Sequence, residues 1–221
     1  KELRAKRHAM EFETIETYMT FDELGGIKEI LPRSRNDAHK LIEECMLLAN
    51  VAAAEYALEH DIPMLYRVHE APEFSRIQKV RDFVKLLGLP FPEQPTQADY
   101  QRVIEATKDR LDAPSIHAVL LRSMMQAYYG ANNAGHYGLA YEAYTHFTSP
   151  IRRYPDLLLH RAIKAYLDKK AYPLSGAALD DAGEHFSQTE RRADEASRSV
   201  TTWLKCHYMQ QHLGDEFVGI I

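Results

Sequence analysis

The sequence predicts a mostly helical α+β fold, and three observations support this prediction. Apolar residues recur every three or four positions over several stretches, the longest at residues 37–59 and 178–212, which is typical of amphipathic helices. Residues 9–30 instead alternate between apolar and polar side chains around Gly25-Gly26, which is typical of a β-hairpin. A short run at residues 64–68 predicts a further strand. We therefore expect a helical body with an N-terminal β-hairpin and a few short strands.

Composition places the chain among ordinary globular proteins. Its 221 residues are 45% hydrophobic and 27% charged, which is enough to bury one sizeable core. The net charge of -5 argues against a general nucleic-acid coat, so a nucleic-acid contact would need a local basic groove. Cys45 and Cys206 lie far apart and outside any CxxC pair, which argues against a disulfide framework and a structural zinc site. These cysteines favour a reducing, cytoplasmic setting, and no apolar run approaches the length of a membrane span.

The first predicted elements are the hairpin and a long helix. The hairpin covers residues 9–30, with Met10, Phe12 and Thr14 in its first run. Asn36 or Asp37 then caps a helix that extends to residue 59, because either side chain can accept bonds from free backbone N–H groups. The apolar face of this helix is predicted at the following positions: Leu41, Cys45, Leu48, Ala52 and Tyr56.

The middle and end of the chain are predicted to be helical around one loop. After the strand at residues 64–68, a helix from residue 74 ends at Gly88, because glycine often terminates helices. Amphipathic helices follow at residues 98–107 and 115–128, with Met124 as core filler. Residues 129–143 predict a loop rich in Gly, Asn and Tyr. The last helix covers residues 178–212 and ends at Gly214.

The segment at residues 144–161 holds the strongest chemical signal. Ser149-Pro150 indicates a helix start, which would place Arg152 and Arg153 in the first turn. Two guanidinium groups beside the positive end of a helix dipole can bind phosphate oxygens in bidentate fashion, so this turn is a candidate phosphate clamp. The alternative is that both arginines pair with surface carboxylates.

Other candidate residues have a structural and a binding interpretation. Glu43 and Glu44 lie near the start of a helix, where carboxylates are stabilised by its dipole. Arg67 and His69 occupy alternate positions of one strand, where a histidine is by default a hydrogen-bonded structural residue. The tyrosines of the loop region could stack on bases or pack in the core: Tyr137, Tyr141 and Tyr144.

Several long motifs in one order resemble those of the ribonuclease II/ribonuclease R (RNB) family, in its ribonuclease R branch. They are RNDAHKLIEECMLLAN at residues 35–50, LYRVH at 65–69, HYGLA at 136–140, THFTSPIRRYPDLLLHR at 145–161 and RRADEA at 191–196. The resemblance implies that residues 1–213 are the C-terminal part of the catalytic domain. Residues 214–221 would begin the following OB-fold (S1-type) RNA-binding domain.

The family implies a processive 3'-to-5' exoribonuclease that hydrolyses single-stranded RNA to nucleoside 5'-monophosphates. Arg152 matches the catalytic arginine, and a carboxylate at Glu43 or Glu44 matches a ribose contact. The family aspartates that hold Mg²⁺ have no match here, so we expect them upstream, in an N-terminal half that would be a partner of this chain, and we expect this chain alone to be inactive. Asp180-Asp181 lies in a stretch that resembles a linker and receives no metal role. The resemblance extends RNA binding to the following residues: Glu43, Glu44, Asn50, Arg67, His69, Tyr137, Tyr144, His146, Thr148, Ser149 and Arg153. The alternative is a non-catalytic RNA-binding or protein-interaction module that kept the fold.

Overall fold

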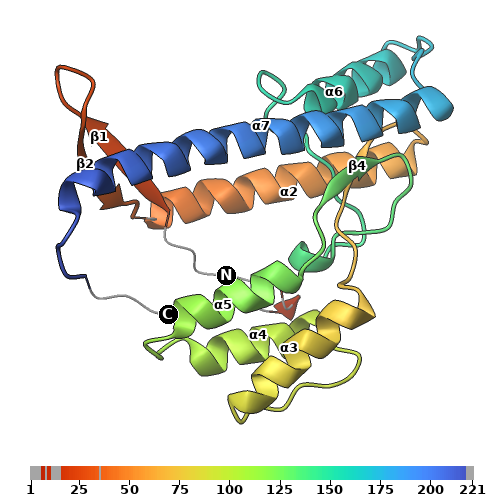
Figure 1. Cartoon of the computed structure of the whole chain (residues 1–221). Helices are drawn as coiled ribbons and strands as arrows, with labels where there is room; N and C mark the ends of the chain where they lie inside the picture. Colours follow the sequence, from red (N-terminus) through yellow and green to blue (C-terminus); the bar gives the residue numbers. More distant parts are fainter. Residues whose placement is uncertain (1–5, 8, 11–15, 35, 218–221) are drawn as a thin grey trace.

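The structure, a computed structural model, describes residues 6–7, 9–10, 16–34 and 36–217. This part of the chain is mostly helical and contains two separate antiparallel sheets of two strands each (Figure 1). The predicted α+β class is therefore confirmed. Two long helices run in opposite directions through the upper part of the molecule in Figure 1, and three shorter helices form a separate group below them.

The N-terminal hairpin pairs β1 (Thr17–Phe21) with β2 (Ile27–Pro32). Its turn is closed by the Asp22 carboxylate, which accepts hydrogen bonds from the backbone N–H groups of Leu24 at 2.9 Å and Gly26 at 2.7 Å. Gly25 has a φ of +81°, a conformation that glycine adopts without steric cost. The predicted hairpin is confirmed over residues 17–30 and extends two residues further than predicted, whereas Phe12 and Thr14 lie outside the described residues.

Helix α2 (Asp37–Glu59) begins at Asn36, as one of the two predicted caps. Asn36 Oδ1 accepts from the His39 N–H at 3.0 Å, and His39 Nδ1 accepts from the Asn36 N–H at 3.3 Å. The predicted apolar face is wrong, since Leu41, Cys45 and Leu48 are exposed. The buried face consists of Leu47, Asn50, Ala53, Ala54 and Ala57. In a helix rich in Leu and Ala two sets of positions share helical spacing, and the small side chains are buried because they allow close packing.

The central sheet pairs β3 (Tyr66–Val68) with β4 (Tyr128–Gly130). It packs against the alanine face of α2 and against Leu159 and Ala162 of α6 (Tyr154–Leu167). The predicted helix at residues 115–128 is too long, because α5 (Ala113–Ser123) ends at Ser123 and the two tyrosines after it enter the sheet. Aromatic side chains favour strands, and pairing with β3 decides the conformation of this segment.

Three helices form the lower core: α3 (Phe74–Leu86), α4 (Gln97–Thr107) and α5. Their buried residues include Val84, Tyr100 and Leu120, and Met124 is core filler as predicted. Met10 belongs to this core too, and its N–H bonds to the Gly138 carbonyl at 3.1 Å. Its predicted place in the hairpin is therefore wrong.

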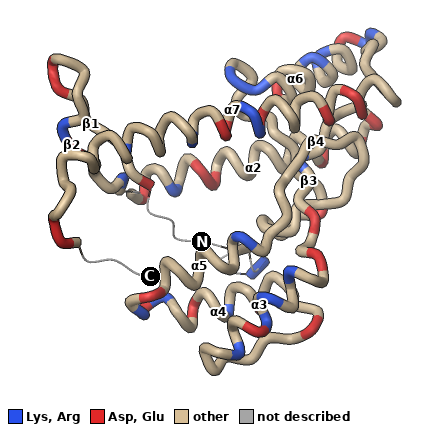
Figure 2. The backbone as a smooth tube through the Cα atoms, in the orientation of Figure 1, with Lys and Arg blue, Asp and Glu red and all other residues tan. Residues whose placement is uncertain are grey.

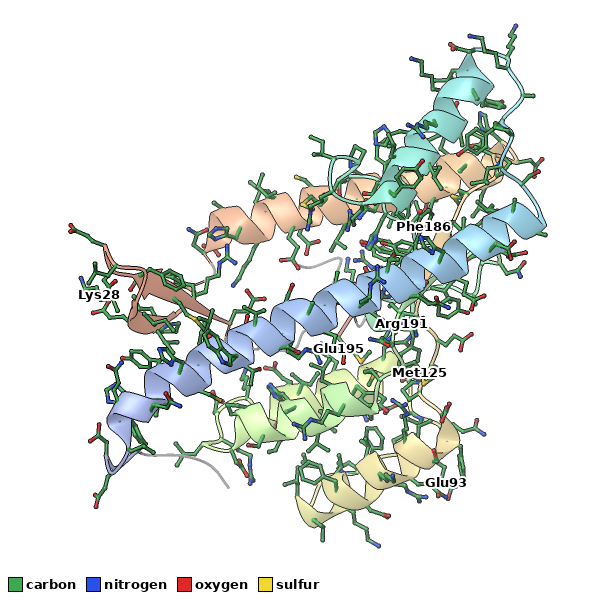
Figure 3. All side chains as sticks on the ribbon, turned by 45° about the horizontal axis from the view of Figure 1, so that its top comes forward. Lys28, Glu93, Met125, Phe186, Arg191 and Glu195 are labelled. Atoms are coloured by element: carbon green, nitrogen blue, oxygen red, sulfur yellow. The ribbon has the colours of Figure 1, made fainter. Side chains whose placement is uncertain are left out.

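The C-terminal part contains α6 (Tyr154–Leu167), α7 (Ala177–Met209) and the short helices η1 (Tyr137–Leu139) and η2 (Gln210–His212). Helix α7 is buried only near its start, at Leu179, Gly183 and Ser187, and residues 191–203 are exposed. Figure 3 shows Phe186 near α6, with Arg191 and Glu195 further along α7. None of the helices in the described part of the chain is both long and apolar enough to cross a membrane.

Candidate functional site

The segment at residues 144–149 runs between the central sheet and helices α2 and α6. Its start is fixed to β3, because the Arg67 N–H donates to the Tyr144 carbonyl at 2.8 Å and the Thr145 hydroxyl donates to the Leu65 carbonyl at 2.7 Å. Tyr144 and Thr145 are buried, at 5% and 2% exposure. The start of this segment therefore belongs to the core, whereas residues 146–149 are half-buried.

Asn50 of α2 supports the same segment from the other side. Its amide nitrogen donates to the Tyr144 hydroxyl at 2.9 Å, and its amide oxygen accepts from the backbone N–H groups of Phe147 at 2.9 Å and Thr148 at 3.3 Å. A buried amide needs such partners, since each unsatisfied polar group costs about 1–3 kcal/mol. In this structure the Asn50 side chain binds backbone N–H groups of the protein, and its predicted contact with RNA stays a prediction.

We define residues 148–153 as the arginine turn. The Ser149 carbonyl accepts from the N–H groups of Arg152 at 3.3 Å and Arg153 at 3.0 Å. The fully buried Asp156 carboxylate accepts from the Ser149 N–H at 2.8 Å and from the Arg153 guanidinium at 2.8 Å.

The predicted helix start at Ser149-Pro150 is therefore wrong. Helix α6 begins at Tyr154, with Arg153 as its N-cap and Pro155 in the first turn. Proline is favoured at that position, so Pro155 takes the place that the sequence suggested for Pro150. Ser149 instead gives its backbone N–H to Asp156, and both arginines precede the helix.

The two arginines differ in their surroundings. Arg153 is mostly buried against Asp156, with 21% of its side chain exposed. The Arg152 side chain is exposed and, within the described part of the chain, makes no hydrogen bond or ion pair. Among the described residues neither arginine pairs with a surface carboxylate, so the alternative interpretation of the sequence is wrong. Figure 2 shows basic residues on the loop before α6 and on the neighbouring part of α7.

A mostly apolar cavity of about 410 Å³ opens between α2 and the arginine turn. Glu43, Asn50, Tyr144 and Arg153 contribute to its wall, together with apolar side chains of α2 such as Met46. Glu44 is not part of this wall, although it adjoins Glu43 in the sequence. The structure thus brings five predicted site residues to one place: Glu43, Asn50, Tyr144, Thr148 and Arg153.

A second network connects the sheet to α7. The Arg67 guanidinium pairs with Glu190 at 2.6 Å and lies 4.7 Å from the centre of the Tyr129 ring. The Tyr129 hydroxyl forms a hydrogen bond of 2.8 Å with His146 Nδ1, and its backbone N–H donates to the Ser187 hydroxyl at 2.9 Å. Arg67 and His146 thus have protein partners in this structure.

Burial lowers the pKa of His146 to about 2, with further contributions from the positive charges of Arg153, Arg67 and Arg152 and from His136. Burial likewise lowers the pKa of His136 to about 3. Both imidazoles are therefore neutral at physiological pH. They contribute no positive charge for binding an anion.

His69 and Tyr137 lie beside a different cavity, of about 660 Å³. The Gly138 N–H donates to His69 Nδ1 at 2.9 Å, so Nε2 carries the proton and donates to the Met125 carbonyl at 2.8 Å. The Tyr137 hydroxyl donates to the Pro95 carbonyl at 3.1 Å, and its ring packs on the lower core. These residues lie away from the arginine turn, and their predicted RNA contacts stay predictions.

Sequence reasoning missed Asp156, Tyr129 and Glu190. Asp156 follows Arg153 at i+3 spacing, which is a signal for an ion pair that the sequence offered. Glu190 lies 123 residues from Arg67, so no local pattern connects them. The described residues include no group of three or more His, Cys, Asp or Glu side chains placed to hold a metal ion.

Comparison with known proteins gives consistent matches. The family model of the RNB domain matches residues 1–169. A curated relative, ribonuclease R of Vibrio parahaemolyticus, is 50% identical over 235 residues, which cover 100% of this chain and 28% of the relative. The chain thus spans less than a third of that relative's length.

Two solved structures are informative. Mycoplasma genitalium RNase R in complex with ribose methylated single-stranded RNA matches 97% of this chain and 35% of its own, with a TM-score of 0.89 at 26% identity. Yeast Ssd1, described as a pseudonuclease, matches 69% of this chain and 20% of its own, with a TM-score of 0.62 at 27% identity. The matched motifs, the family model over residues 1–169 and a near relative over the full length together establish that the chain belongs to the RNB family.

Proposed function

We propose that this chain is the C-terminal part of the catalytic domain of a longer cytoplasmic exoribonuclease that degrades single-stranded RNA processively from its 3' end and releases nucleoside 5'-monophosphates. The observation that supports this most is Arg152, an exposed guanidinium without a partner among the described residues, on a turn that buried side chains hold. RNB family membership and the RNA complex of M. genitalium RNase R support the substrate class.

In this proposal Arg152 contacts the phosphate near the scissile bond. Negative charge increases on the phosphoryl oxygens in the transition state, so a positioned guanidinium stabilises that state more than the bound substrate. Arg152 would then act on the rate of the chemical step. The neutral imidazoles of His136 and His146 leave the arginines as the positive groups of this region.

The cavity beside the arginine turn favours Glu43 over Glu44 as the ribose contact. Glu43 contributes to the cavity wall together with Tyr144 and Arg153, whereas Glu44 does not. A carboxylate can accept a hydrogen bond from the 2'-hydroxyl, which distinguishes RNA from DNA. The apolar side chains of α2 would then contact the base or sugar without reading sequence, as a nuclease indifferent to sequence requires.

Magnesium would be held by carboxylates outside this chain, because the described residues form no metal-binding group. In RNB-type hydrolysis the metal would activate water and stabilise the leaving oxygen. A second candidate function remains, namely a module that binds RNA or protein without cleavage. The likeness to Ssd1, a pseudonuclease, favours this candidate, because a related fold exists there without nuclease function.

Single-turnover cleavage of labelled single-stranded RNA by the full-length protein tests the proposal. With Mg²⁺ present we expect release of mononucleotides from the 3' end, and Arg152→Ala should lower the cleavage rate by about 100-fold or more. RNA affinity should fall much less, since many phosphate contacts remain. Arg152→Lys should recover part of the rate, because lysine keeps the charge but loses the planar fork.

Arg122→Ala is the matched control, since Arg122 is an exposed arginine of α5 outside the site. It should leave the cleavage rate unchanged. If Arg152→Ala weakens binding and leaves the rate intact, Arg152 is a tether and not catalytic. If the full-length protein binds RNA but cleaves none, the non-catalytic module is the correct function.

A further inference from the structure

The hydrogen bonds around the arginine turn assign a role to a residue that has none so far. We propose that Asp156 is a positioning residue, which together with Asn50 fixes the arginine turn so that Arg152 alone is presented to the substrate. The proposal rests on the proposed function, because it concerns the same arginine. Asp156 itself is fully buried and does not reach the substrate.

Three consecutive backbone N–H groups define the start of the turn. Those of Phe147 and Thr148 donate to the Asn50 side chain, and that of Ser149 donates to Asp156. Asn50 comes from α2 and Asp156 from α6, so two helices hold the same stretch of backbone from two sides. Such bonds to buried side chains leave the backbone few alternative conformations.

The hydrogen bonds continue from Asp156 to Arg152. The carboxylate fixes Ser149, and the Ser149 carbonyl in turn accepts from the backbone N–H of Arg152. The position of the Arg152 backbone thus depends on Asp156 through one intervening residue. Displacement of a reacting group by 1 Å can cost about 100-fold in rate, so this path is short enough to affect catalysis.

Asp156 also separates the roles of the two arginines. The Arg153 guanidinium bonds to the same carboxylate oxygen that accepts from Ser149. If Arg153 turned toward a substrate phosphate, it would leave a buried carboxylate without its counter-charge, which is strongly unfavourable. Arg153 is therefore held in the protein, and Arg152 remains available.

A double-mutant cycle in the full-length protein tests this role. Asp156→Asn replaces the charged acceptor by a neutral amide, which weakens the bond from the Ser149 N–H and removes the charge that holds Arg153. We expect the single-turnover rate to fall by about 10- to 100-fold, with RNA affinity nearly unchanged. In the Arg152→Ala background the same substitution should have almost no further effect, because no guanidinium remains to be positioned.

Asp168→Asn is the matched control, since Asp168 lies at the opposite end of α6 and is exposed. It should not change the rate in either background. Equal losses from Asp156→Asn with and without Arg152 would overturn the proposal, because Asp156 would then act independently of that arginine. An unchanged rate in Asp156→Asn would overturn it as well.

A second pair of measurements covers the case in which Asp156→Asn does not fold. Asn50→Ala removes the acceptor for the N–H groups of Phe147 and Thr148 and so loosens the turn from the α2 side, and its cycle with Arg152→Ala should again be non-additive. Additive losses there would contradict the proposal. If wild-type protein has no nuclease activity, the proposed function fails. Amide exchange at Ser149 still tests the positioning role, because it should accelerate in Asp156→Asn and not in Asp168→Asn.

Discussion

His146 is a residue whose burial determines its protonation state. Its ring lies among Tyr129, Tyr144 and the arginines, and these surroundings lower its pKa to about 2. An unfolded chain holds histidine near its ordinary pKa of about 6.5. The folded state therefore excludes a proton that the unfolded state accepts, and the same holds for His136.

These two buried histidines should make the stability of the protein depend on pH. Below about pH 6.5 the unfolded state binds more protons than the folded state. The free energy of unfolding should therefore fall by up to about 1.4 kcal/mol for each unit by which the pH decreases and for each of these histidines. Above pH 7 this loss is absent. His146→Asn keeps a partner for Tyr129 near the position of Nδ1 and should reduce the slope between pH 6.5 and 5, measured by urea unfolding. An unchanged slope would show that His146 titrates alike in both states, and His207→Asn, at an exposed position of α7, is the control.

Residue types at the site were predictable, but several contacts were not. The arginine pair and the Glu43-Glu44 pair stand out in the sequence because charge and local spacing mark them. The partners of Asn50 lie more than 90 residues away, so its role in holding backbone N–H groups follows only from the fold. Asp156 was missed because the Ser-Pro pattern indicated a helix start that the buried carboxylate overrides.

Among the elements, α7 approaches the central sheet closely at Gly183. A Cβ added to Gly183 would lie 2.7 Å from the Tyr129 carbonyl oxygen and 3.0 Å from a methyl group of Leu65. The first atom belongs to the backbone of β4 and cannot move aside without displacing the strand. Glycine is thus required here for packing, although it weakens the helix itself.

Gly183→Ala should therefore destabilise the protein, opposite to its effect in an open helix. We expect a loss of about 1–3 kcal/mol from overpacking, larger than the gain of about 1 kcal/mol in helix propensity. Hydrogen exchange of residues 179–187 in the full-length protein should accelerate. Ser199→Ala, at an exposed position of the same helix, is the matched control and should leave exchange there unchanged. Slower exchange in Gly183→Ala would show that the helix and sheet can separate without cost.

Element positions were predicted better than their faces and ends. The hairpin, α2, α3, α4 and α7 lie where periodicity and turn residues placed them. The buried face of α2 and the end of α5 depend on which surfaces meet the central sheet, and a local pattern does not contain that information. The start of α6 likewise depends on Asp156, a residue inside the helix. Its carboxylate accepts a hydrogen bond from the Ser149 N–H in the preceding turn.

In the whole molecule, the proposed active site is divided between this chain and the segment that precedes it. Cleavage assays on the separate parts can test this division. The isolated 221-residue chain should release no mononucleotides with Mg²⁺, because its described residues form no metal-binding group. Addition of the preceding segment of the full-length protein should restore some cleavage if the two parts can pair. Metal-dependent cleavage by the isolated chain, absent from an Arg152→Ala preparation made in parallel, would contradict this expectation. The predicted boundary between residues 213 and 214 stays a prediction, since residues 218–221 lie outside the described part.

The bonds of Asn50 also have a consequence for the order in which the protein forms during synthesis. Its partners Tyr144, Phe147 and Thr148 lie 94 to 98 residues further along the chain, and the β3–β4 pairing also joins segments that are distant in the sequence. Contacts at such separation require closure of a long loop before they contribute stability, which makes folding slow. While the ribosome adds those residues, the alanine face of α2 has neither β4 nor α6 to cover it. The nascent chain therefore exposes this face until α6 has emerged, and during that interval the chain is most open to aggregation or to a chaperone.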